Sequence, residues 1–100
     1  MTRFILGQLV RLSAEFRDPE SNTLLDPDTV RLRVRNPLGA SALDETFGVG
    51  SAIVRLSQGR YIADVDASES GSWTYYWNSE GLGQAAAEGT FDVRVARALL

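Results

Sequence analysis

The sequence alternates apolar and polar residues in a series of short stretches, which is the pattern of β-strands with one buried face. The clearest stretch spans residues 71–78 and contains both tryptophans of the chain. Its alternate positions divide into one face with Trp73, Tyr75 and Trp77 and another with Ser72, Thr74 and Tyr76. Aromatic residues favour strands, and each large ring can bury ~150–250 Å². We therefore expect this stretch to form the central strand of an all-β core.

Further strands are predicted before and after the tryptophan stretch. The same alternation, weakest in the third of these segments, marks residues 8–18, 29–36, 40–50, 52–56, 60–66 and 84–95. Asp-Pro, Asn-Pro and glycine-containing segments separate them and favour turns. About seven short strands at this spacing, without a helical stripe, predict an all-β fold: a single immunoglobulin-like antiparallel β-sandwich.

The inward positions of the predicted strands supply a candidate core. Its largest members are Phe16, Val34, Tyr61, Trp73, Tyr75, Trp77, Phe91 and Val93. In the last stretch the inward positions begin with small residues, Ala85, Ala87 and Gly89, and end with bulky ones. We expect the small residues to pack closely beneath the large rings of the tryptophan stretch.

The chain of 100 residues has the length of one domain. We assign residues 8–95 to the sandwich, residues 1–7 to a short apolar N-terminal arm and residues 96–100 to a tail. No apolar run approaches the ~18–20 residues that span a membrane, and the N-terminal segment is too short for the core of a signal peptide. We expect a protein made in a cytoplasm, not exported by the general route and without a membrane partner.

Charge and composition narrow the classes of function. The net charge is −3 and the sequence pI is near 4.8, which argues against nucleic-acid binding. The chain has no cysteine, histidine or lysine, so all 10 basic residues are arginines. Disulfides and lysine nucleophiles are therefore excluded, and the commonest general base and transition-metal ligand is missing. We predict a protein that is not an enzyme and has no cofactor or metal site.

The acidic residues leave one metal alternative open. Residues 64–69 are rich in aspartate and glutamate, but Glu69 and Tyr75 stand where a helix-loop-helix calcium site needs a glycine and a glutamate. Calcium bound between sandwich loops, with Asp26 and Asp28, is the alternative to the favoured interpretation of these residues as ordinary turn acids.

Three arginines form the first candidate binding feature. Arg31, Arg33 and Arg35 stand at every second position, so they share one sheet face at a spacing of ~6.6–7 Å. One interpretation is an exposed face that pairs across strands with carboxylates, for which Asp64, Asp66 and Asp92 are the candidates. The other is a docking face for an acidic protein surface.

Aromatic and apolar residues outside the predicted core supply the second candidate feature. Tyr76 lies opposite the core rings, where it is either partly covered by a neighbouring strand or anchors a protein or carbohydrate ligand. Phe4, Ile5 and Leu6 make the arm apolar, and such a segment needs somewhere to dock. We expect the arm to add to the sheet edge of a neighbouring protein.

A series of motifs resembles a known family. The motifs are Asp26-Pro27-Asp28-Thr29-Val30, Gly59-Arg60-Tyr61, Gly71-Ser72-Trp73-Thr74-Tyr75-Tyr76-Trp77 and Ala87-Glu88-Gly89-Thr90-Phe91-Asp92-Val93. Over residues 7–95 the series is similar to the small immunoglobulin-like structural proteins encoded among the virion genes of tailed bacteriophages and prophages. One departure is the short arm, because capsid cement proteins of this kind often carry a long one.

The resemblance implies a non-enzymatic virion protein, made in the cytoplasm of a host bacterium. The expected role is capsid decoration (cement) or a head–tail accessory that binds phage capsid or other virion proteins in multiple copies, with self-association left open. The alternative is a host-surface or glycan-binding module displayed on the virion, which would use Tyr76 and the loop at residues 78–83. Which part of the particle is bound does not follow from the sequence.

Overall fold

The structure is a computed structural model that describes residues 3–82 and 84–99. Within these residues it contains eight strands and one short 3-10 helix. The strands are β1 (Arg3–Ile5), β2 (Leu9–Glu15), β3 (Thr29–Arg35), β4 (Ser41–Thr46), β5 (Ile53–Ser57), β6 (Arg60–Asp66), β7 (Gly71–Glu80) and β8 (Ala86–Arg94), and the 3-10 helix is η1 (Arg97–Leu99). Met1, Thr2, Gly83 and Leu100, from the predicted arm, loop and tail, lie outside the described residues.

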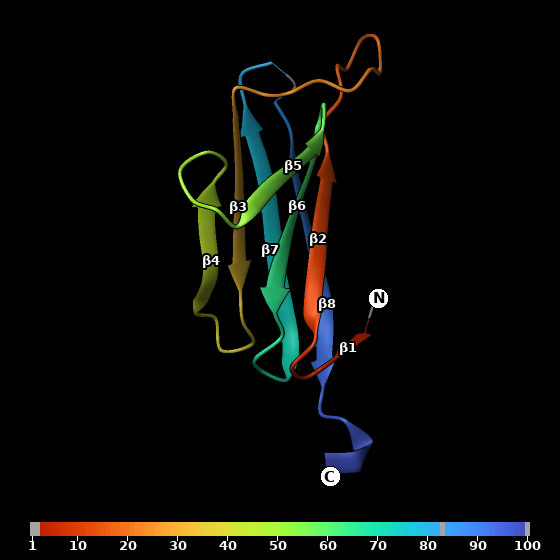
Figure 1. Ribbon diagram of the computed structural model, residues 1–100, viewed down its shortest axis with the longest axis vertical. Coiled ribbons are helices and arrows are strands. Elements are labelled where there is room, and N and C mark those ends of the chain that lie inside the picture. Colours follow the sequence, from red (N-terminus) through yellow and green to blue (C-terminus); the bar gives the residue numbers. More distant parts are fainter. Residues whose placement is uncertain (1–2, 83, 100) are drawn as a thin grey trace.

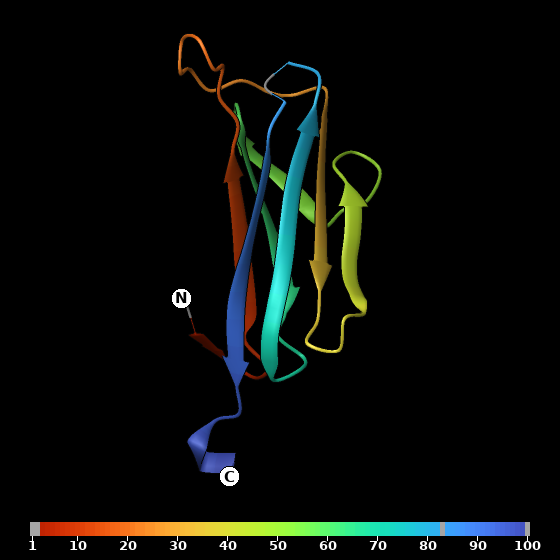
Figure 2. The same cartoon turned by 180° about the vertical axis from the view of Figure 1, so that it is seen from behind.

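The strands form two sheets that lie face to face (Figure 1), and Figure 2 shows the same sandwich from behind. The large sheet has the strand order β1-β8-β7-β3-β4, and the small sheet has the order β2-β6-β5. Neighbouring strands are antiparallel except β1, which runs parallel to β8. The sandwich is elongated, with extents of 50 × 25 × 21 Å. This architecture confirms the predicted all-β sandwich.

The stretch with both tryptophans forms β7, which lies inside the large sheet between β3 and β8. Leu32 of β3 stands opposite Trp77, and Phe91 of β8 stands opposite Trp73. The predicted central position of this stretch therefore agrees with the structure. The structure also forms β1 within the segment that the sequence assigns to the arm.

The two sheets bury a core of aromatic and aliphatic side chains. Of the candidate core residues, Tyr75 is half-buried and the others, Phe16, Val34, Tyr61, Trp73, Trp77, Phe91 and Val93, are buried. Trp73 stacks on Phe91 with a centroid distance of 5.6 Å and an interplanar angle of 17°. The indole Nε1–H of Trp73 donates to the Glu69 carbonyl at 3.0 Å, so the ring is buried with its polar atom satisfied.

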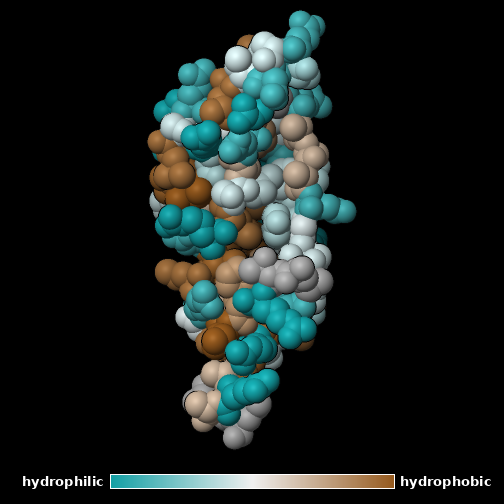
Figure 3. Space-filling view, turned by 90° about the vertical axis from the view of Figure 1, so that its right-hand side faces the viewer, coloured by the Kyte–Doolittle hydropathy of each residue, from teal (hydrophilic) through white to brown (hydrophobic). Residues whose placement is uncertain are grey.

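The beginning of β8 differs from the sequence expectation. Ala85 and Ala87 are exposed, although the alternation places them on the inward side. The reason is that the small sheet is narrower than the large one, so a groove stays open between β2 and the start of β8. Figure 3 looks onto this side of the molecule, where pale and brown surface interrupts the hydrophilic surface. Gly89 fits the expectation, because a Cβ there would collide with the Tyr75 ring.

Gly59 joins three chain segments at the far end of the small sheet. Its carbonyl accepts the Phe16 N–H at 2.8 Å, and its own N–H donates to Asp26 Oδ1 at 2.8 Å. Its φ of +73° lies in the left-handed region, and a Cβ on this residue would stand 2.7 Å from the Phe16 carbonyl oxygen. The backbone geometry therefore requires glycine here.

Replacing Trp73 tests whether the stacked ring is the centre of the core. Trp73→Ala should lower the free energy of unfolding by about 3–5 kcal/mol, since it leaves a large cavity against Phe91. Tyr76→Ala, on the outward side of the same strand, should cost about 1 kcal/mol or less. Urea unfolding followed by far-UV circular dichroism measures both. Similar losses for the two variants would contradict the assigned core.

Glycine-to-alanine changes separate steric crowding from backbone strain. Gly59→Ala and Gly39→Ala both place an alanine at positive φ, +73° and +82°, but only the Gly59 site is crowded by backbone atoms. Gly39→Ala should cost about 1 kcal/mol, the strain alone. Gly59→Ala should cost clearly more, because the clash must also be relieved by moving Phe16 or Leu25. Equal melting temperatures for the two variants would show that the backbone around Gly59 can relieve the clash at little cost in stability.

Candidate interaction surface

The outward side of the large sheet brings the two sequence candidates together. Arg31, Arg33 and Arg35 project from β3 on this side, because Val30, Leu32 and Val34 between them are buried. In the β3–β7 register Arg33 stands directly opposite Tyr76. Tyr76 in turn stands opposite Glu88 of β8, and Arg33 stands opposite Asp44 of β4. We call this transverse row Asp44–Arg33–Tyr76–Glu88 the cross-sheet row.

The three arginines differ in how strongly they are engaged. Arg31 donates from Nε and Nη2 to the two oxygens of Asp44, at 2.9 and 3.0 Å. This pairing lowers the pKa of Asp44 and raises that of Arg31, in each case chiefly through the hydrogen bond. Arg33 reaches Asp44 only at 3.9 Å, and Arg35 donates to the Gly39 carbonyl at 2.9 Å. Of these three arginines, Arg33 therefore makes the weakest contact with other residues of the domain.

The carboxylate that meets the arginines is not one that the sequence suggested. Asp64 and Asp66 belong to β6 in the small sheet, and Asp92 belongs to β8, which is not adjacent to β3. Asp64 instead accepts two hydrogen bonds from Arg11 of β2, at 2.9 and 3.2 Å, which lower its pKa. Asp44 was missed because it lies in the weakly patterned segment that becomes β4.

Tyr76 is open to solvent beside these arginines. Its exposed fraction is 37%, so the neighbouring strands cover part of the residue and leave the rest accessible. A shallow depression next to it is lined by Arg33, Arg35, Thr74, Tyr75, Tyr76 and Glu88. An aromatic ring between a weakly engaged arginine and a carboxylate can bind polar or charged protein groups, or stack on a sugar.

The apolar arm lies against its own domain. Phe4 packs edge-on against Phe91 with a centroid distance of 5.6 Å, and the Leu6 N–H donates to the Arg94 carbonyl at 2.8 Å. Phe4 and Leu6 are half-buried against the core, whereas Ile5 on the outward side is 40% exposed. The arm thus has an intramolecular docking place, and of its three apolar side chains Ile5 is the one most available to a partner.

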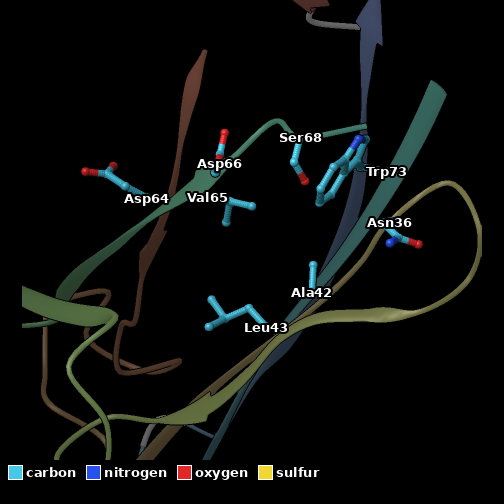
Figure 4. A pocket seen from close by; sticks show the side chains of 8 residues that line it. All are labelled: Asn36, Ala42, Leu43, Asp64, Val65, Asp66, Ser68 and Trp73. Carbon is cyan, nitrogen blue, oxygen red and sulfur yellow. The ribbon is translucent and has the colours of Figure 1, made fainter. Parts of the chain in front are cut away.

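A hollow between the sheets has acidic residues on its rim. Figure 4 shows it lined by Asn36, Ala42, Leu43, Asp64, Val65, Asp66, Ser68 and Trp73. Asp64 and Asp66 point in different directions and away from the interior of the hollow, where Leu43, Val65 and Trp73 lie. This arrangement does not bring two carboxylates to a common substrate position, which acid–base hydrolysis needs.

Asp26 forms a polar cluster that the sequence did not indicate. Its carboxylate accepts from Arg55 Nη2 at 2.9 Å, from the Gly59 N–H at 2.8 Å and from the Tyr61 hydroxyl at 3.0 Å. The bonds from Arg55 and Gly59 hold the pKa of Asp26 far below its ordinary value of 3.8. Burial, followed by the bond to Asp26, raises the pKa of Tyr61.

The hydrogen bonds of Asp26 argue against the alternative that this residue binds calcium. The carboxylate already accepts from an arginine and two further donors, so its oxygens are engaged within the fold. In the part of the chain that the structure describes, no group of three or more acidic, histidine or cysteine residues is arranged to hold a metal ion. Nor does that part contain a helix long and apolar enough to cross a membrane.

The comparison with solved structures identifies the fold. A structure described as "Crystal structure of the Lin-41 filamin domain" superposes with a TM-score of 0.71, covering 95% of this chain and 85% of that one at 20% identity. The fold is an immunoglobulin-like β-sandwich. At this identity the likeness concerns the immunoglobulin-like fold alone. No family model matches the sequence, and the comparison with curated proteins gives no match.

The Asp26 cluster predicts a stability effect of pH. Because the pKa of Asp26 is lowered on folding, the ionised carboxylate stabilises the fold above pH 3.8, and this contribution is lost as the pH falls below that value. Asp26→Asn should therefore melt well below the wild type at neutral pH, and the gap should shrink in acid. Thermal melts between about pH 7 and pH 2.5 measure it.

A matched control is Asp64→Asn, which removes a carboxylate paired with a single exposed arginine. Exposed pairs of this kind contribute little, so its melting temperature should stay closer to that of the wild type at every pH. If the difference in melting temperature between Asp26→Asn and the wild type stayed constant with pH, the ionised Asp26 carboxylate would not be what stabilises the fold.

Proposed function

We propose that this protein is a non-enzymatic structural protein of a tailed-phage particle, which binds the protein surface of the virion through the outward side of its large sheet. Capsid decoration or a head–tail accessory position is the role that the sequence resemblance favours. The observation that carries the binding surface is the placement of Arg33 beside the exposed Tyr76 on an open sheet face.

The chemistry of this surface suits a protein contact. Arginine and tyrosine are both enriched among the residues that dominate protein interfaces, since both combine apolar area with hydrogen bonding. Arg33 can exchange its 3.9 Å contact with Asp44 for a partner carboxylate without breaking the tighter Arg31–Asp44 pair. An acidic patch on the virion surface is therefore the partner chemistry that we assign to Arg33 and Arg35.

The arm supplies a second, smaller contribution to the proposed contact. Ile5 is exposed at the edge of the large sheet, next to β1 backbone groups that do not face β8. Phe4 and Leu6 hold the arm to the core, so removal of the whole arm would disturb the fold as well as binding. Ile5→Ser is therefore the better probe of an arm contact than truncation.

The test is co-sedimentation of purified protein with phage particles or empty expanded heads of the source phage, with the bound amount read by gel densitometry. Wild-type protein should sediment with the particles and saturate at a fixed copy number, high for shell decoration and low for a neck or tail position. The double variant Arg33→Glu, Tyr76→Ser should lose about tenfold or more in affinity, as expected for central interface residues.

The control variant is Arg11→Ala, which removes an exposed arginine from the small sheet on the opposite side of the sandwich. It should bind like the wild type. Absence of sedimentation by folded wild-type protein would overturn the virion role. A change of tryptophan fluorescence on adding host glycans, together with that absence, would favour the glycan-binding alternative.

A further inference from the structure

The outer edge of β8 is only partly covered by its neighbour. β1 pairs with Asp92, Val93 and Arg94 at the end of β8, in parallel. The earlier part, from Ala86 to Thr90, has β7 on one side and no paired strand on the other within the described residues. An uncovered strand edge presents unpaired backbone donors and acceptors, which another strand can bind.

The ladder register shows which backbone groups face the open side. Ser79 of β7 donates to the Ala85 carbonyl at 2.9 Å, and on the opposite side the Arg94 carbonyl accepts from Leu6 of the arm at 2.8 Å. Backbone groups alternate from side to side along a strand. The odd-numbered residues of β8 therefore pair with β7, and Ala86, Glu88 and Thr90 direct their N–H and C=O groups toward the open edge.

A groove runs beside this edge. It is lined by Ser13, Ala14, Glu15, Phe16, Tyr75, Trp77 and residues 85–88. Apart from Glu15 and Glu88 its walls are small or aromatic, and in Figure 3 pale and hydrophobic surface lies among hydrophilic side chains on this side. Trp77 is 2% exposed, and its Nε1–H is buried without a hydrogen-bond partner among the described residues. Trp77 and the small residues therefore leave room in the groove for the short side chains of an added strand.

The β8 edge has few of the features that usually block strand addition, since Glu88 is the one charged residue between Ala85 and Thr90. Residues 85–87 are three alanines, and the segment to Thr90 contains no proline and no basic residue. The β2 edge across the groove is different, because Glu15 there is engaged by Arg17 at 2.9 Å and by Arg60 at 3.7 Å. Edges are normally protected by charge, proline or bulges, so the open part of β8 is the accessible edge of the two.

The charges in the cross-sheet row indicate which charge an added strand should carry. Asp44, Arg33, Tyr76 and Glu88 follow one another across four adjacent strands of the large sheet. Glu88 is the last member and makes no ion pair within the described residues. A fifth strand would place its outward side chain next to Glu88, where a basic residue is favoured and an acidic one repelled.

We infer that the β8 edge from Ala86 to Thr90 binds an extended segment of a partner protein by strand addition, with basic residues outward beside Glu88 and small apolar or hydroxyl residues inward in the groove. A second copy of this chain fits less well. Pairing two β8 edges antiparallel about Glu88 would set the two glutamates opposite each other, which destabilises a sheet. This site shares only Glu88 with the depression beside Tyr76, and it does not rest on the proposed virion role.

A peptide titration tests the inference. The probe is a short capped peptide in which arginine alternates with valine and threonine, added to the uniformly labelled full chain and followed by amide hydrogen exchange and NMR shifts. The N–H groups of Glu88 and Thr90 should exchange rapidly in the free protein and at least about tenfold more slowly in its presence. The same peptide with glutamate in place of arginine should bind more weakly.

Two substitutions separate backbone pairing from side-chain charge. Glu88→Pro removes an N–H that β7 does not use, and proline is tolerated where the N–H faces away from the ladder. It should abolish peptide binding. Glu88→Gln keeps the N–H and loses the charge, so binding should weaken several-fold and remain detectable. Far-UV circular dichroism and thermal melts establish that each variant is folded.

If Glu88→Pro does not fold, Ala87→Leu replaces it, because a larger side chain at this exposed position fills the groove. It should block the peptide while leaving the core intact. Unchanged exchange at Glu88 and Thr90 with saturating peptide, or equal binding by wild type and Glu88→Pro, would overturn the inference. The Arg33→Glu, Tyr76→Ser variant should bind this peptide normally, which distinguishes failure here from failure of the virion contact.

Discussion

The stack of Trp73 on Phe91 is the contact on which the rest of the structure depends. The two rings belong to neighbouring strands of the large sheet, β7 and β8, and both point into the core, where their centroids lie 5.6 Å apart. Phe4 of β1 meets the same Phe91 ring edge-on at 5.6 Å. One aromatic cluster therefore holds together the central strand, the last strand and the N-terminal arm. Its burial supplies much of the apolar area that a small domain needs to fold.

Alternation of apolar and polar residues predicted most of the sandwich, because a strand with one buried face imposes that pattern directly on the sequence. β1 was not expected as a strand because three residues, Arg3–Ile5, are too few to show a period. Ala85 and Ala87 were placed inward because alternation reports the side of the pleat. Whether anything covers that side depends on the width of the opposite sheet, which is a tertiary property.

The sequence predicts which residues of the candidate surface share one side of a strand, but not which of them become neighbours across strands. A period of two places Arg31, Arg33 and Arg35 on one side of β3 whatever the strand order, and it sets Tyr76 opposite the core rings. That Arg33 meets Tyr76, and that Asp44 supplies the carboxylate, follows only from the pairing of β3 with β7 and β4. Strand order joins segments far apart in sequence, and no local pattern encodes it.

The two proposed binding surfaces meet at Glu88. The outward side of the large sheet offers side chains, and the open edge of β8 offers backbone groups. Glu88 contributes its carboxylate to the depression beside Tyr76 and its backbone to the edge. A strand bound at that edge would extend the cross-sheet row by one member, so its outward residue would lie next to any ligand held by Tyr76. Because the members of the row are exposed to water, charge in the edge ligand would change binding at the sheet face only weakly, so a peptide at the edge and a partner at the sheet face can bind together.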